Sequence, residues 1–230
     1  MRGRGLCAAG ILWLAGCAQD PLAEHNIYWG LSPFERPTGP LVRVLDTDTA
    51  TPAKQGLLYT AMRDAEIAAT YTDRAIARQA EPGETEEAIA EVVYAIEPAE
   101  APPWNAASRR AAGYGSLAGW AGHGYGLQRS LSGMAEVVTS ATERDPAMLQ
   151  AYGPRALDCT RNTQDRAAEV LALSQQVLNR GGGTAPEATL AQIREVAAAL
   201  NRGVPGPGAR GCGLQEVERQ LNQALPVRTG

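Results

Sequence analysis

Cysteine and histidine are the side chains best suited to metal or covalent chemistry, and this chain of 230 residues has four cysteines and two histidines. Neither histidine, His25 or His123, follows a glutamate by three positions, as a di-iron site in a helical bundle requires. The HExxH motif and the Cys-x-x-Cys-His motif of covalent haem attachment are absent. His123, within AGHGYG, could bind a metal or haem by itself.

Residues 113–126, GYGSLAGWAGHGYG, form a second place where the sequence could bind a ligand. The glycines would let the backbone approach a ligand closely, and they precede an expected helix N-terminus, where anions are favoured. Tyr114, Trp120 and Tyr125 would then form an aromatic wall beside His123. The alternative is a connection between helices whose aromatic side chains pack inward. Neither the P-loop motif nor GxGxxG is matched, which argues against a nucleotide site.

Motifs of nucleophilic catalysis are also absent. The Gly-x-Ser-x-Gly motif is not matched around Ser116 or Ser132. Glu87 and Glu91 lie one turn apart in an expected helix, a spacing typical of a solvated helix face. Without a recognisable nucleophile or acid–base pair, we predict that the protein is not an enzyme.

The first 16 residues have the three-part pattern of an export signal. Two arginines carry positive charge, residues 5–16 are largely apolar, and small residues end the run. The apolar stretch is too short to cross a bilayer, which takes roughly 20 apolar residues. The segment Leu14–Cys17, LAGC, resembles the lipobox of bacterial lipoproteins. This resemblance implies cleavage before Cys17 and attachment of lipid to it; the alternatives are an ordinary secretory signal with a chance cysteine, or a buried helix.

The residues after the cysteine bear on location. Ala18 and Gln19 follow Cys17, so the aspartate that favours inner-membrane retention in enterobacterial lipoproteins is missing. We therefore expect a lipid-anchored protein of the cell envelope, on the outer membrane facing the periplasm. Loss of two arginines with residues 1–16 would change the formal net charge from −4 to −6. No block of basic residues remains, so we expect no nucleic-acid partner.

Cys159 and Cys212 remain once Cys7 leaves with the signal and Cys17 carries lipid. Exported proteins mature where disulfides persist, so this even pair predicts a Cys159–Cys212 disulfide. Closing a loop of roughly 50 residues would stabilise the fold by about 4 kcal/mol in the chain-entropy model. The alternative, a two-cysteine metal site, would need other soft ligands, and none lies nearby in the sequence.

Apolar residues recur at helical spacing through most of the chain. Two helical hairpins are predicted at 52–97 and 127–179, followed by helices from Thr184 to Gly203 and over 214–225. Caps at Thr51-Pro52 and at Thr184 predict helix starts, and Pro154 predicts a kink or break.

Strand signals are almost absent beyond a short extended piece at 41–46. We therefore predict an all-α fold, with residues 51–230 forming an antiparallel helical bundle with short connections. An irregular, lipidated tether is expected at 17–50, after the signal peptide at 1–16.

Three segments resemble parts of uncharacterised exported helical proteins of Proteobacteria, namely EVVYAIEP, GYGLQRSLSGMAEVV and YGPRALDCTRNTQDRAAEVLALSQQVL. The resemblance lies in composition and helical texture, and it implies an all-helical envelope protein without implying an activity. Together these observations favour a lipid-anchored protein that binds an envelope partner protein and needs no cofactor. The alternative is a periplasmic protein that binds a small ligand, metal or haem at residues 113–126.

Overall fold

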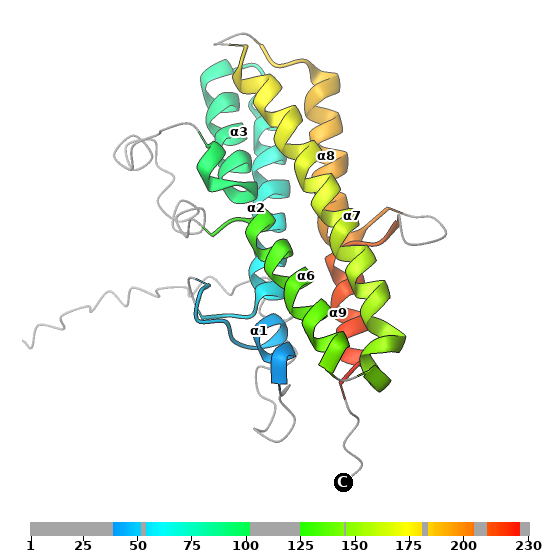
Figure 1. The fold of residues 1–230 in the computed structure, drawn as a ribbon. Coiled ribbons are helices and arrows are strands. Elements are labelled where there is room, and N and C mark those ends of the chain that lie inside the picture. The colour runs from blue at the N-terminus through cyan, green and yellow to red at the C-terminus, as the bar shows by residue number, and fades with distance from the viewer. Residues whose placement is uncertain are drawn as a thin grey trace, which may run out of the picture.

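The structure is all-α in the parts of the chain that it describes. The computed structural model describes residues 39–51, 54–101, 125–144, 146–180, 184–204 and 211–225 (Figure 1). Within these ranges no strand occurs, so the all-α prediction is confirmed. The α-helices are α1 (Val42–Leu45), α2 (Leu57–Ala77), α3 (Pro82–Ile96), α6 (Leu127–Arg144), α7 (Pro146–Leu178), α8 (Glu187–Arg202) and α9 (Leu214–Gln223), and the short 3-10 helices are η2 (Gly39–Leu41) and η3 (Pro98–Glu100).

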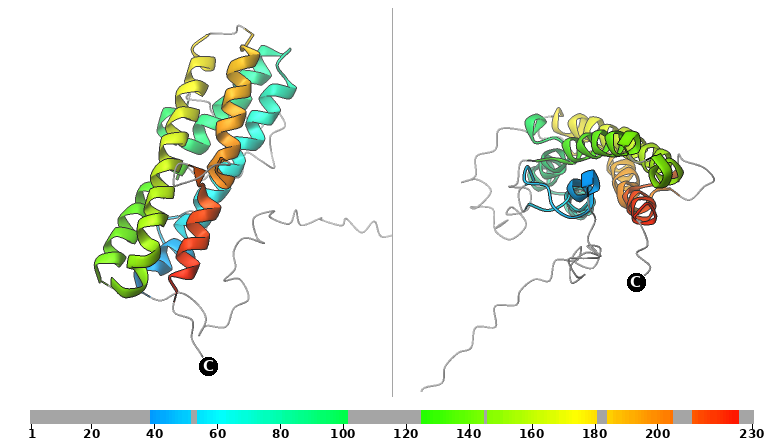
Figure 2. Two further views of the ribbon diagram at one scale, coloured as in Figure 1. Left: turned by 90° about the vertical axis from the view of Figure 1, so that its right-hand side faces the viewer. Right: turned by 60° about the horizontal axis from the view of Figure 1, so that its bottom comes forward.

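The helices are arranged in four columns. Two of the columns are single long helices, α2 with 21 residues and α7 with 33. A third column, α3 followed by α6, contacts both of them, and so does the fourth, α8 followed by α9. Figure 2 shows α9 continuing below α8. Since α2 and α7 run opposite to the other two columns in Figure 1, neighbouring columns are antiparallel.

Aliphatic side chains and alanines fill the space between the columns. On α2 the buried Leu57, Ala61, Ala65 and Ala68 recur every three or four positions, which places them on one broad stripe. Burying each large aliphatic side chain stabilises the fold by about 1.5–3 kcal/mol. The largest fully buried side chains are Tyr71, Leu57, Met62, Ile89, Ile96, Leu127, Leu131, Met134, Leu190, Ile193, Leu200 and Leu214.

Glycines stand where the two composite columns change helix. Gly126, just before α6, has φ +86°, and a Cβ there would lie 3.1 Å from the carbonyl oxygen of Ile96 at the end of α3. Gly203, just after α8, has φ +77° and lies against Gly211, whose carbonyl accepts a 2.6 Å hydrogen bond from Val204 N. Only glycine adopts this backbone conformation without strain. Glycine at these two positions therefore allows each composite column to end one helix and begin the next.

Residues 41–46, expected as an extended piece, are helical, so that expectation was wrong. Leu41 lies in η2, and Val44 and Leu45 lie in α1; all three are buried against the core of the long helices. The three apolar side chains fall on one side of a helical turn, whereas an extended chain would direct neighbours to opposite faces. The last part of the segment expected as a tether therefore packs on the body of the protein.

Of the kink or break predicted at Pro154, the break is absent, because α7 continues through this residue. Pro154 is exposed, so water can satisfy the carbonyl that loses its partner N–H. The two predicted caps were wrong as well. Helix α2 begins after Gly56, so Thr51 does not cap it. The Thr51 hydroxyl instead donates to the carbonyls of Asp48 and Gln55 in the preceding loop. Helix α8 begins after Pro186.

Candidate functional site

Most residues singled out as ligand-binding lie outside the described part of the chain. This group includes Tyr114, Trp120 and His123, so ligand binding by them stays a prediction. The predicted lipidation residue Cys17 also lies outside the described residues, so lipidation stays a prediction too. Tyr125 is described, immediately before α6. Among the described residues, no group of three or more His, Cys, Asp or Glu side chains could hold a metal ion.

The Cys159–Cys212 disulfide is present, as predicted. The sulfur atoms are 2.07 Å apart, and the bond joins the middle of α7 to the residues just before α9. Both cysteines are buried. Because the two sulfur atoms are bonded to each other, the alternative of a two-cysteine metal site is wrong.

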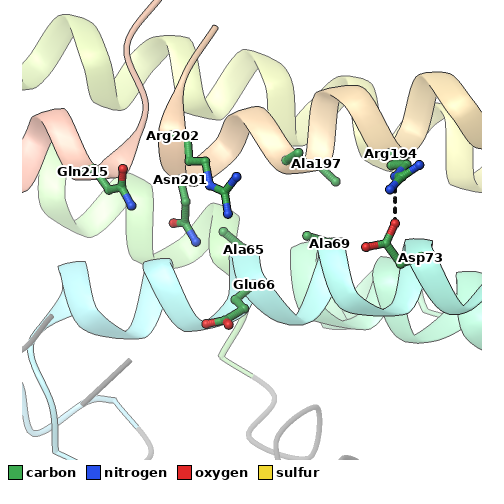
Figure 3. Close-up of a pocket in the computed structure, with 10 residues that line it drawn as sticks. Ala65, Glu66, Ala69, Asp73, Arg194, Ala197, Asn201, Arg202 and Gln215 are labelled. Carbon is green, nitrogen blue, oxygen red and sulfur yellow. Dashed lines mark ion pairs between the residues drawn. The ribbon is translucent and has the colours of Figure 1, made fainter. Parts of the chain in front are cut away.

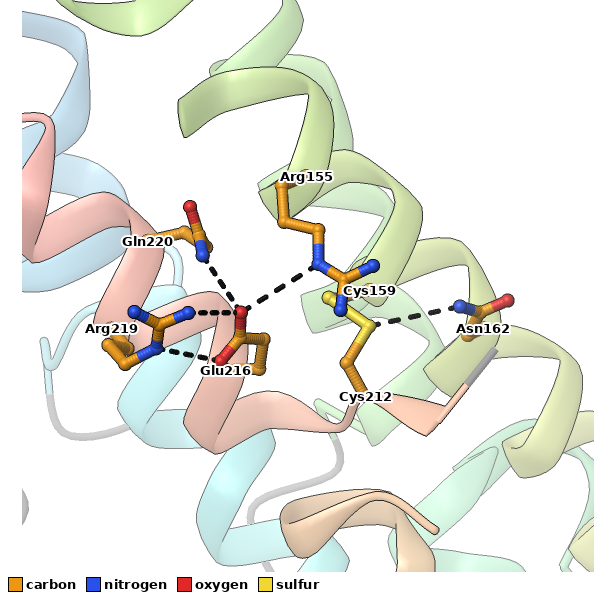
Figure 4. A network of polar contacts seen from close by, with 7 residues as sticks. All are labelled: Arg155, Cys159, Asn162, Cys212, Glu216, Arg219 and Gln220. Atoms are coloured by element: carbon orange, nitrogen blue, oxygen red, sulfur yellow. Dashed lines mark hydrogen bonds and ion pairs between the residues drawn. A yellow bond between two sulfur atoms is a disulfide. The ribbon is translucent and has the colours of Figure 1, made fainter. Parts of the chain in front are cut away.

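A polar network surrounds this disulfide and holds the start of α9 (Figure 4). Glu216 accepts two hydrogen bonds from Arg219, at 2.7 and 2.8 Å, and one from Gln220 at 2.8 Å. The Nε atom of Arg155 on α7 lies 3.7 Å from the same carboxylate. These hydrogen bonds, above all those from Arg219, lower the pKa of Glu216 to about 2, so this carboxylate remains ionised at neutral pH.

A groove of about 340 Å³ runs between α2 and α8 and reaches the start of α9 (Figure 3). Its two ends differ in charge balance. At one end the Nε atom of Arg194 lies 2.8 Å from Asp73 Oδ1, so that these two charges neutralise each other. The other end holds Asn201, Arg202 and Gln215. The lining also has four alanines, of which Ala65 and Ala197 are buried, Ala69 is half-buried and Ala198 is exposed.

The side chain of Asn201 is held by the helix opposite. Its Nδ2 atom donates a 3.0 Å hydrogen bond to the carbonyl oxygen of Met62, from α8 to α2. Its Oδ1 atom is buried and has no hydrogen-bond partner in the structure. The groove therefore offers charged and amide side chains, but none of its lining residues is a serine, cysteine or histidine. Such a set suits recognition by ion pairs and hydrogen bonds.

A second groove, of about 460 Å³, lies at Tyr125. The guanidinium carbon of Arg129 lies 4.7 Å from the centre of the Tyr125 ring, at the distance of a cation–π contact. Burial raises the pKa of the Tyr125 hydroxyl, and the charge of Arg129 opposes this shift. The other lining residues are Glu97, Pro98, Ala99, Gln128 and Ser132.

Of the residues predicted to bind a ligand, the structure thus places Tyr125 beside a groove. It adds Arg194, Asn201, Arg202, Asp73 and Gln215, which the sequence did not single out. Arg194 and Arg202 are eight positions apart on α8, a spacing that could have indicated one helix face. Nothing in the sequence indicated that α2 lies beneath that face.

No protein-family model, curated protein or solved structure matches the chain. Among the helices of the described residues, none has the length and apolar character needed to span a bilayer.

Proposed function

We propose that the protein is a lipid-anchored helical protein of the bacterial cell envelope that binds a partner protein through the groove between α2 and α8. The observation that carries the binding function is the groove itself, which is lined by charged and amide side chains together with four alanines. Alanine side chains leave room for a partner's main chain, and the polar groups along the groove supply specificity.

Two further observations support the cellular location. The segment Leu14–Cys17 resembles a lipobox, with a positively charged and apolar segment before it. The Cys159–Cys212 disulfide is of the kind that persists in oxidising compartments such as the periplasm. On this proposal the lipid holds Cys17 at the membrane, on the outer membrane facing the periplasm, while the helical body meets its partner.

Photo-crosslinking in living cells tests the binding function. A photoreactive amino acid replaces Ala198, an exposed alanine in the groove, or Ala168, an exposed alanine of α7 outside the groove. We expect one and the same envelope protein to be captured reproducibly from position 198 and not from position 168. Equal capture from both positions, or none from position 198, would contradict binding in the groove.

A second candidate function is binding of a small ligand at the Tyr125 groove. It is favoured by the Arg129 guanidinium over the Tyr125 ring at the edge of the groove, because this pair could hold an anionic or aromatic group. The predicted contributions of His123, Tyr114 and Trp120, including metal or haem binding by His123, belong to this candidate. Native mass spectrometry of the gently purified protein tests it: a bound mass that is lost in Arg129→Gln supports it, and a clean apo mass argues against it.

A further inference from the structure

We draw no further inference here: the strongest candidate, the groove at Tyr125 and Arg129 beside the start of α6, belongs to the candidate site already described, and nothing in the structure shows what covers it.

Discussion

At the scale of single residues, Asp64 on α2 is the least expected feature of the structure. Its side chain is buried, and its Oδ2 atom has no hydrogen-bond partner in the structure. Burial raises the pKa of this carboxyl from 3.8 to about 8, although the charge of the adjacent Arg63 opposes the shift. Asp64 is therefore protonated in the folded protein at neutral pH, whereas in the unfolded chain it is ionised.

This difference predicts a pH-dependent stability. The pKa of Asp64 is higher in the folded protein than in the unfolded chain. The contribution of Asp64 to the stability of the fold is therefore fully present below the unfolded pKa of 3.8 and is lost as the pH rises toward about 8. Between these two pH values Asp64 is ionised in the unfolded chain only, so the folding equilibrium constant should fall about tenfold per pH unit. Asp64→Asn, which is neutral at every pH, should flatten the curve between pH 5 and pH 8 in urea unfolding.

A matched control for this experiment is Asp73→Asn. Asp73 is on the same helix but is 59% exposed and paired with Arg194. It should retain the wild-type slope. If the wild-type slope is no steeper than that of Asp64→Asn, the carboxyl of Asp64 is not protonated in the folded state.

At the scale of elements, α9 depends on its attachments. A helix of ten residues is too short to be stable by itself in water, so tertiary contacts must hold it. The disulfide, the Arg155–Glu216 pair and a hydrogen bond from Arg166 to the carbonyl of Cys212 all join its beginning to α7. The apolar Leu214, Val217 and Leu221 bury its inner face. The disulfide thus ties the start of α9 to the neighbouring α7 column.

Removal of the disulfide should loosen the attachment of α9 first. The double variant Cys159→Ala/Cys212→Ala should lose about 2–4 kcal/mol of unfolding free energy, measured by urea denaturation. Hydrogen exchange should accelerate most in α9 and at the end of α8, where local unfolding needs only these contacts to break.

Dithiothreitol provides the control for the disulfide. It should lower the stability of the wild-type protein to that of the double variant and leave the double variant unchanged. Unaltered exchange in α9 after reduction would show that the polar network around Glu216 is sufficient to hold the helix.

At the scale of the whole molecule, the proposed anchor and the proposed binding groove are separate parts. Cys17 precedes the described residues, and the groove lies on the four-column body between α2 and α8. A lipid of several acyl chains would give firm attachment, since each buried methylene contributes about 0.8 kcal/mol. The body could then present its groove without itself entering the bilayer.

Substitution of Cys17 tests the anchor. The wild-type protein should carry a lipid mass and partition into the detergent phase of Triton X-114, whereas Cys17→Ala should keep residues 1–16 and carry no lipid. Cys7→Ala changes a cysteine inside the expected signal and should behave as the wild type does. Efficient cleavage of Cys17→Ala to a soluble protein would instead favour an ordinary secretory signal.

Features that depend on neighbouring residues or on simple counting could be predicted from the amino-acid sequence alone. Apolar spacing along α2, α6, α7 and α9 predicted helices, because a helix brings positions three and four apart onto one face. Only two cysteines were available for pairing after Cys17, so Cys159 and Cys212 could be joined without knowledge of the fold. Helix starts were less predictable, because α2 and α8 begin after Gly56 and Pro186 and not at the caps expected at Thr51 and Thr184.

Which helices share a column, and which charges are paired across it, could be seen only once the helices were packed together. An arginine at the end of a helix, such as Arg202, looks like any solvated charge in the sequence. The groove beside it exists because α8 packs on α2, where Asn201 Nδ2 donates to the carbonyl of Met62 across 139 positions of the chain. Contacts over such separations depend on how whole helices pack, and local periodicity does not encode them.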